Sequence, residues 1–319
     1  MHVAMLAGAC CAIALATAAP AAAQGYPSRP VRLVVGFPPG GGVDVVARLF
    51  AEKLSGSLGQ SVVVENRPGA SGAIAARQVA TAEPDGHTIL VNSNSMVVHQ
   101  VMNPAAGLDI ARDLKPLMTV APQSMILATA PDLGVDSLAG LTALARSRKL
   151  QYGSPGAGSV PHLLVEYFFT SLAHVELEHV PYQGAAQALT GAMAGQIQLA
   201  SVTTPPAIAL VQAGKLKGMA VTSAARNRAL PDVPTVAESG YPAVVINVWT
   251  GLFAPAGTPS PVTQRFAKAA LDVAALPDVK EKLASLGFDT GTTSSEQFGR
   301  DLADEIRRWS DVVQKARVQ

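Results

Sequence analysis

The sequence has only two cysteines, and both lie near its N-terminus. Cys10 and Cys11 fall within a stretch of small apolar residues that covers the first two dozen positions. The rest of the chain can therefore form no internal disulfide and cannot build the thiolate sites that hold structural zinc. An H-E-x-x-H pattern is also missing. We expect neither a metal nor another cofactor, and a fold that is stabilised by its own hydrophobic core.

Strong charge and aromatic clusters are missing as well. Lys and Arg total 24 against 23 Asp and Glu, and no basic run occurs. This balance argues against nucleic acid and against an anionic membrane surface as partners. Aromatic residues make up 5% of the chain, too few for a groove that stacks sugars or bases. After the N-terminal stretch, no segment approaches 18 uninterrupted apolar residues, so we expect a soluble mature chain.

Residues 1–23 are expected to form a secretory signal peptide. They are small and apolar and end in an Ala-x-Ala motif directly before Gln24, which predicts cleavage near the Ala23–Gln24 bond. Cys10 does not indicate a lipoprotein, because the large aliphatic Leu6 stands four positions before it and not three. The pattern predicts an exported, periplasmic protein.

The clearest structural pattern covers residues 31–54, VRLVVGFPPGGGVDVVARLFAEKL. A short apolar run predicts a buried strand, the Pro-Pro-Gly-Gly-Gly run predicts a turn, and the spacing of the later apolar residues predicts an amphipathic helix. A strand that turns through glycines into a helix leaves backbone N–H groups directed at one point. The helix dipole favours negative charge there. We expect this turn to be half of an anion-binding clamp.

The same strand–helix order continues along the chain. Strands are expected at residues 60–65, 88–92, 113–130, 150–153, 179–182, 196–201, 219–222 and 244–253. Helices are expected at residues 73–80, 137–148, 185–194, 207–213, 261–276 and 295–315. This alternation predicts an α/β fold with doubly wound, mainly parallel sheets, in which ligands bind at the carboxyl ends of strands. A second Pro/Gly-rich turn at residues 154–159 predicts the other half of the clamp.

Eight motifs in a fixed order connect the sequence with a known family. They are GFPPGGGVD (36–44), ENRPGASG (65–72), EPDGHTIL (83–90), YGSPGAGSVPHL (152–163), HVPYQG (179–184), GKLKGMAVT (214–222), LPDVPTVAESGYP (230–242) and WTGLFAPAGTP (249–259). Together they resemble the substrate-binding proteins of tripartite tricarboxylate transporters, also called Bug receptors. The resemblance covers nearly all of the chain after the signal peptide.

This resemblance implies a two-lobe type II periplasmic solute-binding fold, each lobe a doubly wound, mainly parallel sheet with flanking helices. The expected boundaries are 24–123 with 229–319 for lobe 1 and 124–228 for lobe 2. It implies a receptor that binds a small carboxylate-bearing organic acid between the lobes, not an enzyme. Its partners would be that acid and either the permease subunits of a tripartite transporter or a sensor. We expect it to act as a monomer.

In the family, two strand–turn–helix loops hold a ligand carboxylate through backbone amides. Carried onto this sequence, these loops are residues 37–44 and 154–162. The chain departs from the family pattern at Val43, where a hydroxyl residue is common, and in residues 200–206, which often carry an Asp or Asn. The candidate ligand-binding residues are Phe37, Gly40, Gly41, Gly42, Asp44, Ala70, Ser93, Ser154, Gly156, Ala157, Gly158, Ser159, His162 and Thr203.

The two glycine-rich turns fit a carboxylate better than a phosphate. Neither matches G-x-G-x-x-G or G-x-x-x-x-G-K-[ST], and neither contains the Lys or Arg that a phosphate usually recruits. The alternative is that the three glycines at 40–42 serve only a tight connection that needs positive φ.

Each candidate side chain also has an ordinary structural interpretation. Asp44 could be a helix-start residue, orient the glycine turn, or receive a ligand ammonium group. Ser154 and Ser159 could be turn and cap residues or hydroxyl donors. His162 could donate to a carboxylate or make a structural contact. Phe37 could pack over the apolar part of the ligand or belong to the core.

A competing hypothesis is an exported hydrolase or lyase that uses Ser154 or Ser159 with His162. The pattern around Ser154 speaks against it, because Tyr152 occupies the first glycine position of the G-x-S-x-G nucleophile motif. The spacing of His162 and Glu166 is more typical of a surface i,i+4 pair.

Overall fold

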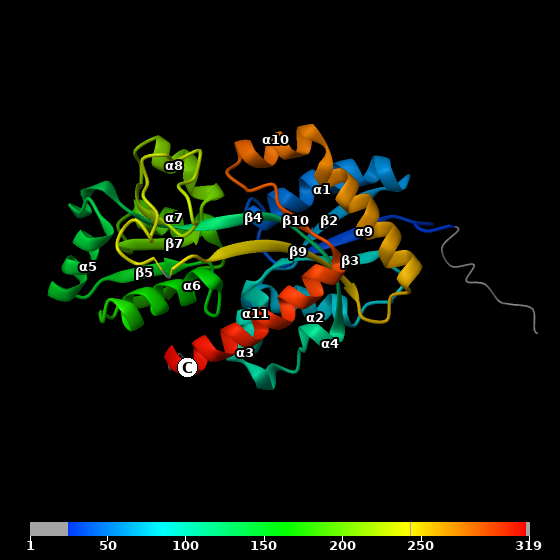
Figure 1. Ribbon diagram of the computed structural model, residues 1–319, viewed down its shortest axis with the longest axis horizontal. Helices are drawn as coiled ribbons and strands as arrows, with labels where there is room; N and C mark the ends of the chain where they lie inside the picture. The colour runs from blue at the N-terminus through cyan, green and yellow to red at the C-terminus, as the bar shows by residue number, and fades with distance from the viewer. Residues whose placement is uncertain (1–24, 243, 317–319) are drawn as a thin grey trace, which may run out of the picture.

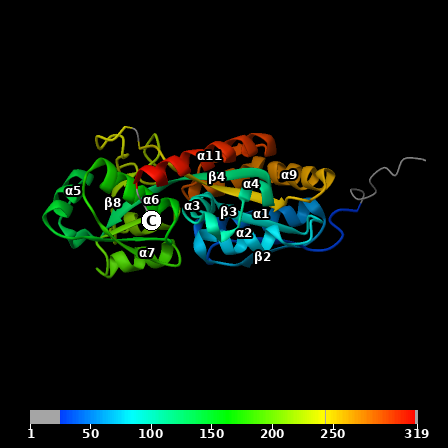
Figure 2. The same cartoon turned by 90° about the horizontal axis from the view of Figure 1, so that it is seen from below.

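The computed structural model describes residues 25–242 and 244–316. The expected signal peptide and its cleavage site lie outside the described residues. The described chain forms two α/β halves at opposite ends of the long axis of the molecule, with β4 and β9 running between them (Figure 1). The view in Figure 2 shows the same two halves side by side. No helix in the described segments combines the length and apolarity that a bilayer span requires.

The first half is built on three parallel strands. These strands are β1 (Val31–Val35), β2 (Val62–Asn66) and β3 (Thr88–Ser93), with β1 between the other two. β1 and β3 are buried almost throughout, as expected for parallel strands that helices cover on both faces. Their crossover helices are α1 (Gly42–Leu58) and α2 (Ala73–Ala80). The structure confirms the strand–turn–helix unit that the first motif predicts.

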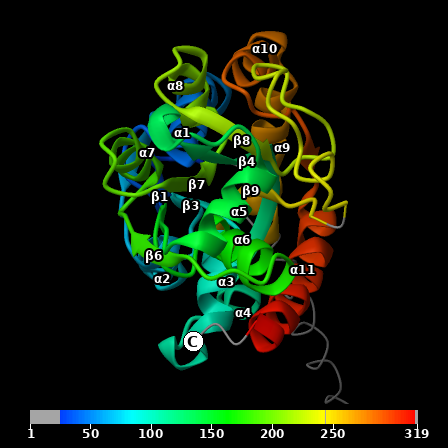
Figure 3. The ribbon, with the colours of Figure 1, turned by 90° about the vertical axis from the view of Figure 1, so that its left-hand side faces the viewer.

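The second half repeats this arrangement. It contains the parallel strands β5 (Gln151–Ser154), β6 (Glu178–Pro181) and β7 (Leu199–Thr203), with β5 between the other two. Its helices are α5 (Leu138–Ser147), α6 (Val160–Val165), the π-helix η5 (Glu166–Leu172), α7 (Ala185–Met193) and α8 (Ile208–Gln212). Figure 3 shows α7 and α8 on one side of this sheet and α5 and α6 on the other.

β4 (Leu114–Thr129) connects the two sheets. Its first part pairs with β9 (Asn247–Pro255) and with β10 (Thr292–Thr293), and its last five residues pair with β7 and with β8 (Lys217–Val221). The register between β4 and β9 slips between Val120 and Gln123. Within this slip Ala121 has a φ of 50°. The slip inserts one extra residue into β4, a bulge that turns the side chains which follow it.

The remaining helices cover the outside of the two sheets. They are α3 (Ser95–Met102), α4 (Ile110–Asp113), α9 (Ser260–Ala275), α10 (Pro277–Ser285) and α11 (Ser295–Ala316). Three-residue 3₁₀ turns occur at Ala70–Gly72, Pro104–Ala106, Pro131–Leu133 and Pro205–Ala207 (η2, η3, η4 and η6).

Three hydrophobic clusters form the core. One lies in the first half under α1 and α9, and one lies in the second half under α7 and α8. The third is continuous across both halves, because it joins residues of α2 and α3 with those of α5, α6, η5 and α11. Figure 2 shows α11, in red, extending from the first half toward α6. The two halves thus share one continuous hydrophobic core, and each half also has a separate core of its own.

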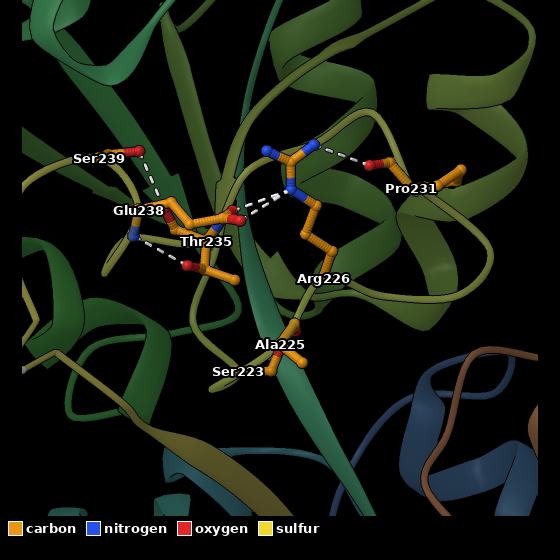
Figure 4. Close-up of polar contacts among 7 residues, drawn as sticks. All are labelled: Ser223, Ala225, Arg226, Pro231, Thr235, Glu238 and Ser239. Atoms are coloured by element: carbon orange, nitrogen blue, oxygen red, sulfur yellow. Dashed lines mark hydrogen bonds and ion pairs between the residues drawn. The ribbon is translucent and has the colours of Figure 1, made fainter.

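The connector between β8 and β9 packs on the second half. Thr235 bridges to Val221 of β8, and Leu230 and Val233 belong to the core cluster under α7 and α8. Figure 4 shows the polar contacts that fix it: Arg226 donates to the carboxylate of Glu238, and Glu238 accepts from the backbone N–H of Thr235. The second segment of lobe 1 was expected to begin at residue 229, but Leu230, Val233 and Thr235 pack on the other half.

Candidate functional site

A cavity of about 230 Å³ lies where the two halves meet. It is bounded by the segments that follow the carboxyl ends of β1, β3 and β7, by the bulge of β4, and by the start of α7. Its volume is below the roughly 300–1,000 Å³ of pockets for drug-sized ligands, so it suits a small molecule. The residues that line it are Phe37, Pro38, Pro39, Gly41, Gly42, Val43, Ser93, Ser95, Gln123, Pro155, Pro161, Gly184, Ala185, Ala186, Gln187, Thr203 and Val248.

The first wall of the cavity is the start of α1. Gly41 is the N-cap, and no side chain caps its helix. The N–H groups of the first turn of a helix have no partner within the helix. Gly41, Gly42 and Val43 line the cavity, so this turn and its positive dipole end face the enclosed space. This is the turn that the sequence analysis predicts as one half of an anion clamp.

The opposite wall is the start of α7, and this differs from the expectation. Residues 184–187 line the cavity, and the N-cap Gly184 also lacks a capping side chain. Gly184 closely approaches the first turn, because a Cβ at this position would lie 3.3 Å from Cγ of Pro38. The second half of the clamp was expected in residues 154–162. That loop contributes only Pro155 and Pro161 to the lining.

Several polar groups of the loop at 154–162 already have hydrogen-bond partners. Ser159 caps α6 by accepting from the N–H of His162 at 3.3 Å, and the N–H of Gly158 donates to Nδ1 of His162 at 3.1 Å. The N–H of Val160 donates across the halves to Oγ of Ser95 at 3.2 Å. The α-helical part of α6 is also only six residues long. Few free donors remain for a ligand.

Ser154 and His162 belong to a buried cluster behind this loop. Oγ of Ser154 donates to the carbonyl of Gly156 at 3.0 Å and lies 2.8 Å from Nε2 of His179. The ring of His179 stacks between those of His162 and Tyr152, with centroid separations of 4.1 and 4.8 Å.

Burial keeps both histidines of this cluster uncharged. It lowers the pKa of His162 to about 4. Burial and the neighbouring His162 lower the pKa of His179 to about 3. The cluster is thus neutral at physiological pH. It packs the second half and does not reach the cavity wall, so Ser154, Ser159 and His162 have structural roles in this arrangement.

Asp44 orients the glycine turn from behind. Its side chain is 2% exposed and accepts from the N–H of Gly40 at 2.9 Å, from Nδ2 of Asn66 at 2.8 Å and from Nε of Arg48 at 2.9 Å. Burial acts to raise the pKa of the Asp44 carboxyl, but these hydrogen bonds outweigh it and hold the pKa below its ordinary value. Of the interpretations that the sequence left open, the structure favours the orienting role. Neither Asp44 nor Gly40 lines the cavity.

Five predicted site residues do line the cavity: Phe37, Gly41, Gly42, Ser93 and Thr203. Three others, Ala70, Gly156 and Ala157, line an adjoining cavity of about 400 Å³ that shares Phe37 and Pro155 with the first.

Beside this second cavity, Oγ of Ser71 in η2 donates to the carbonyl of Ala157 at 2.8 Å. This bond, and the one between Val160 and Ser95, join the two halves directly. Gly156, Ala157 and Gly158 therefore lie where the halves touch.

The sequence-based candidates do not include Gln123, Ser95 or the start of α7, which line the cavity. The last had a recognisable signal, because HVPYQG is also a strand end followed by a glycine and a helix of small residues. Gln123 had none, since its position at the cavity depends on the bulge in β4. Among the described residues, no side chain that carries charge at neutral pH lines the cavity. Negative charge there can be met only by N–H groups, hydroxyls and amides.

A two-lobe α/β protein with a small, neutral cavity between two uncapped helix starts is a periplasmic solute receptor of the type II kind. The comparisons identify its family. A family model described as "Tripartite tricarboxylate transporter family receptor" matches residues 46–318. The chain belongs to this family, as the ordered motifs indicate.

Relatives agree over almost the whole length. The chain is 36% identical over 296 residues to a protein of the tcbD–tcbE intergenic region of Pseudomonas sp., covering 92% of this chain and 88% of the relative. It is 34% identical to the protein BugT of Bordetella pertussis, covering 93% of this chain and 92% of BugT.

Two solved structures of similar identity carry ligands. A Rhodopseudomonas palustris protein with adipate has a TM-score of 0.86 at 34% identity, covering 91% of this chain and 98% of that chain. MatC from the same species, with bound malate, has a TM-score of 0.84 at 30% identity, covering 90% of this chain and 100% of MatC. These neighbours confirm the expected two-lobe fold.

Proposed function

We propose that this protein binds a small carboxylate-bearing organic acid in the cavity between its two lobes and delivers it to a membrane permease. The observation that carries this proposal is the meeting of two uncapped helix starts, those of α1 and α7, at one cavity. The N–H groups of α1 in one lobe and those of α7 in the other both favour a negatively charged group in the cavity. The absence of a charged side chain among the described lining residues favours a carboxylate over a phosphate, which usually recruits Arg or Lys.

The related structures support the same ligand class. Adipate and malate, the ligands of the two R. palustris proteins, are both small carboxylates. The family description names a tripartite tricarboxylate transporter, which favours permease subunits over a sensor as the partner. Export by the signal peptide at residues 1–23 would place the receptor in the periplasm, where we propose that it works as a monomer.

We propose a ligand site that keeps Phe37, Gly41, Gly42, Ser93 and Thr203 from the sequence-based set. It adds Ser95, Gln123 and the start of α7 at residues 184–187. Of the remaining candidates, Gly40 and Asp44 position this site. Ala70, Gly156, Ala157 and Gly158 lie where the lobes meet, and Ser154, Ser159 and His162 stabilise the second lobe.

The lobe boundaries follow the core contacts. β4 exchanges β9 for β7 and β8 as partners after Ser124. The connector before β9 packs on β8. We propose that lobe 2 covers residues 124–246 and that lobe 1 covers residues 24–123 and 247–319.

The geometry favours binding without catalysis. Ser154 is fully buried, and its hydroxyl faces His179 and not His162. Ser159 is an N-cap that is 1% exposed. A hydrolase would need a nucleophile and a base in contact with the substrate. Neither serine lines the cavity, so we propose that the protein leaves its ligand unchanged.

Thermal unfolding with a panel of small acids tests the proposal. A bound acid at 100 times its Kd adds about 2.7 kcal/mol to the unfolding free energy, so malate, adipate and monocarboxylates of similar size should include acids that raise the Tm. NMR of the recovered acid should show no chemical change. Turnover that disappears in His162→Ala would support the hydrolase alternative. A Tm that no acid raises would contradict the proposed function.

A further inference from the structure

Gln123 is a buried amide at the wall of the cavity with unused hydrogen-bonding groups. Its side chain is 1% exposed, and it lines the cavity. Within the described part of the chain, neither Oε1 nor Nε2 has a hydrogen-bond partner. Leaving a buried polar group unpaired costs about 1–3 kcal/mol. A partner for both atoms is therefore expected from the molecule that occupies the cavity.

The bulge in β4 brings Gln123 to this wall. Across the bulge, Ala121 and Pro122 together oppose Trp249, the single residue of β9 between the pairs Val120–Thr250 and Gln123–Val248. Val120 and Ala121 are both buried in the core cluster of lobe 1. The extra residue changes the alternation of side chains, so that Gln123 faces the cavity. This local distortion occurs in the strand that joins the lobes.

The amide lies against the first turn of α1. A Cβ at Gly42 would be 2.9 Å from Oε1 and 3.4 Å from Nε2 of Gln123. Glycine at position 42 is what allows the amide to approach the helix start. The amide and the N–H groups of this turn can therefore contact the same end of a ligand, the end that carries the carboxylate.

The nitrogen and the oxygen of the amide need different hydrogen-bond partners. Nε2 is a donor and can share a carboxylate oxygen with the helix start, but Oε1 is an acceptor. An ionised carboxylate has no proton to offer it. A hydroxyl or an ammonium group on the carbon next to the carboxylate would place a donor within reach of Oε1.

The surroundings decide between these two donors. Of the described residues, none with a carboxylate side chain lines the cavity, so an ammonium group there would be a buried charge without a counter-charge. A hydroxyl is neutral and avoids that cost. The rest of the wall is largely apolar, with Phe37, Pro161, Ala185 and Val248. It fits an aliphatic body.

We propose that Gln123 makes this receptor selective for 2-hydroxy carboxylates with an aliphatic body, by accepting a hydrogen bond from the hydroxyl and donating one to the carboxylate. This inference rests on the proposed function and specifies its ligand class.

Isothermal titration of the exported protein with three acids of one chain length tests this selectivity. The probes are 2-hydroxyhexanoate, as separate enantiomers, hexanoate and 2-aminohexanoate. One enantiomer of 2-hydroxyhexanoate should bind at least ten-fold more tightly than hexanoate, and 2-aminohexanoate should bind more weakly than both.

Two variants assign the selectivity to Gln123. In Gln123→Leu the ratio between 2-hydroxyhexanoate and hexanoate should fall to near one, while hexanoate still binds. In Gln123→Glu the added carboxylate should weaken both of these acids and improve 2-aminohexanoate relative to them. Gln198→Leu is the matched control. Gln198 is half-buried away from the cavity, where it accepts from the N–H of Gln151, and this variant should keep the wild-type ratio.

The possible failures are distinct. If the wild type binds hexanoate and 2-hydroxyhexanoate equally, or if Gln123→Leu keeps the preference, the inference is wrong and the carboxylate site stands. If none of these acids nor malate nor adipate binds, the proposed function is wrong and the inference falls with it.

Discussion

Single residues determine whether the cavity can accept an anion. Gly42 leaves space for the amide of Gln123, while Asp44 holds the turn from behind through Gly40 and Asn66. Neither role requires a charged side chain in contact with the ligand. Recognition by N–H groups and one amide explains how a site without described cationic lining residues can still bind an acid.

Gly42→Ala should weaken the binding of carboxylates at least ten-fold. The added methyl group would lie 2.9 Å from Oε1 of Gln123, so the amide must shift and the first N–H groups become less accessible. One lost hydrogen bond to a charged group is worth about 1.5–3 kcal/mol. Titration calorimetry measures the effect. The control is Gly56→Ala in the same helix, because an added Cβ there would have no atom of the described residues within 4 Å. Equal affinities of the two variants for the carboxylate would disprove the role of Gly42.

Asp44→Asn should lower the unfolding free energy at pH 7 by about 1–3 kcal/mol, because three donors lose a charged acceptor. The folded state lowers the pKa of Asp44, so its stabilisation is present above the unfolded pKa and disappears as the pH falls through the folded pKa. Urea unfolding from pH 7 to pH 3 should therefore show a shrinking difference between wild type and variant. A difference that stays constant with pH would exclude this explanation.

At the scale of elements, two loops of similar sequence have different tasks. No side chain caps the first turn of α1, whereas in the first turn of α6 the N–H groups of His162 and Val160 donate to Ser159 and Ser95. The histidine cluster behind the second loop is a packing unit. α11 adds a further unit, because Glu305 accepts from Nε1 of Trp249 at 2.6 Å and from Nε1 of Trp309 at 3.1 Å.

The histidine cluster predicts a loss of stability in acid. The folded pKa values of His162 and His179 are lowered to about 4 and about 3, so the unfolded chain takes up protons first. The unfolding free energy should decrease as the pH falls from about 6.5 toward 4. In His179→Phe the aromatic stack is kept and one proton uptake is removed, so urea unfolding at several pH values should show a shallower decrease. An unchanged slope would contradict the burial of a neutral imidazole at this position.

Glu305→Ala should destabilise the contact between α11 and the start of β9. Both tryptophans of the sequence donate to this carboxylate, and so does Nδ2 of Asn94 at 2.8 Å. Removing the acceptor leaves these donors unpaired in a buried site, at a cost of about 1–3 kcal/mol each. Tryptophan emission should shift to longer wavelength, and the midpoint of urea unfolding should fall. Unchanged emission would show that Glu305 is not their common partner.

The sequence predicted those helices and strands whose local apolar pattern matches their place in the fold. Apolar spacing and glycine turns predicted the unit from β1 to α1, and α2 was found at residues 73–80 as expected. α3 was missed because Ser93, Asn94 and Ser95 resemble a loop, although a short helix follows them. α10 was missed because its few buried positions, Val279 and Leu283, make a weak periodic signal.

The second half of the clamp was assigned to residues 154–162 because both loops share a Pro/Gly-rich composition. Composition cannot show that N–H groups of this loop are already bonded, to Ser159 and His162 within the loop and to Ser95 across the lobes. The same holds for Gln123. Its place at the cavity depends on the bulge at Ala121 and Pro122, and sequence pattern does not reveal this.

At the scale of the whole molecule, binding and lobe contact are coupled. The cavity is bounded by both lobes, which also meet through Ser71 with Ala157 and through Ser95 with Val160. In the proposed site, an anion held by α1 and α7 together would stabilise the arrangement in which the lobes touch and so would favour a closed form over an open one. A permease could distinguish loaded from empty receptor by this arrangement.

Metal removal should not affect binding. Among the described residues, no three His, Cys, Asp or Glu side chains converge on one point, and the proposed ligand contacts are N–H, hydroxyl and amide groups. Protein dialysed against EDTA should bind carboxylates with the same affinity as untreated protein. A loss of affinity that added Ca²⁺ or Zn²⁺ restores would contradict this account of the site.

The comparison of an acid with its uncharged amide tests the central claim most directly. Hexanoate and hexanamide have nearly the same shape, and only hexanoate carries the charge that the two helix starts attract. Titration calorimetry should show one hexanoate bound per chain and roughly 100-fold weaker binding of hexanamide, the equivalent of about 3 kcal/mol. Equal affinity for both compounds would contradict a carboxylate clamp between α1 and α7.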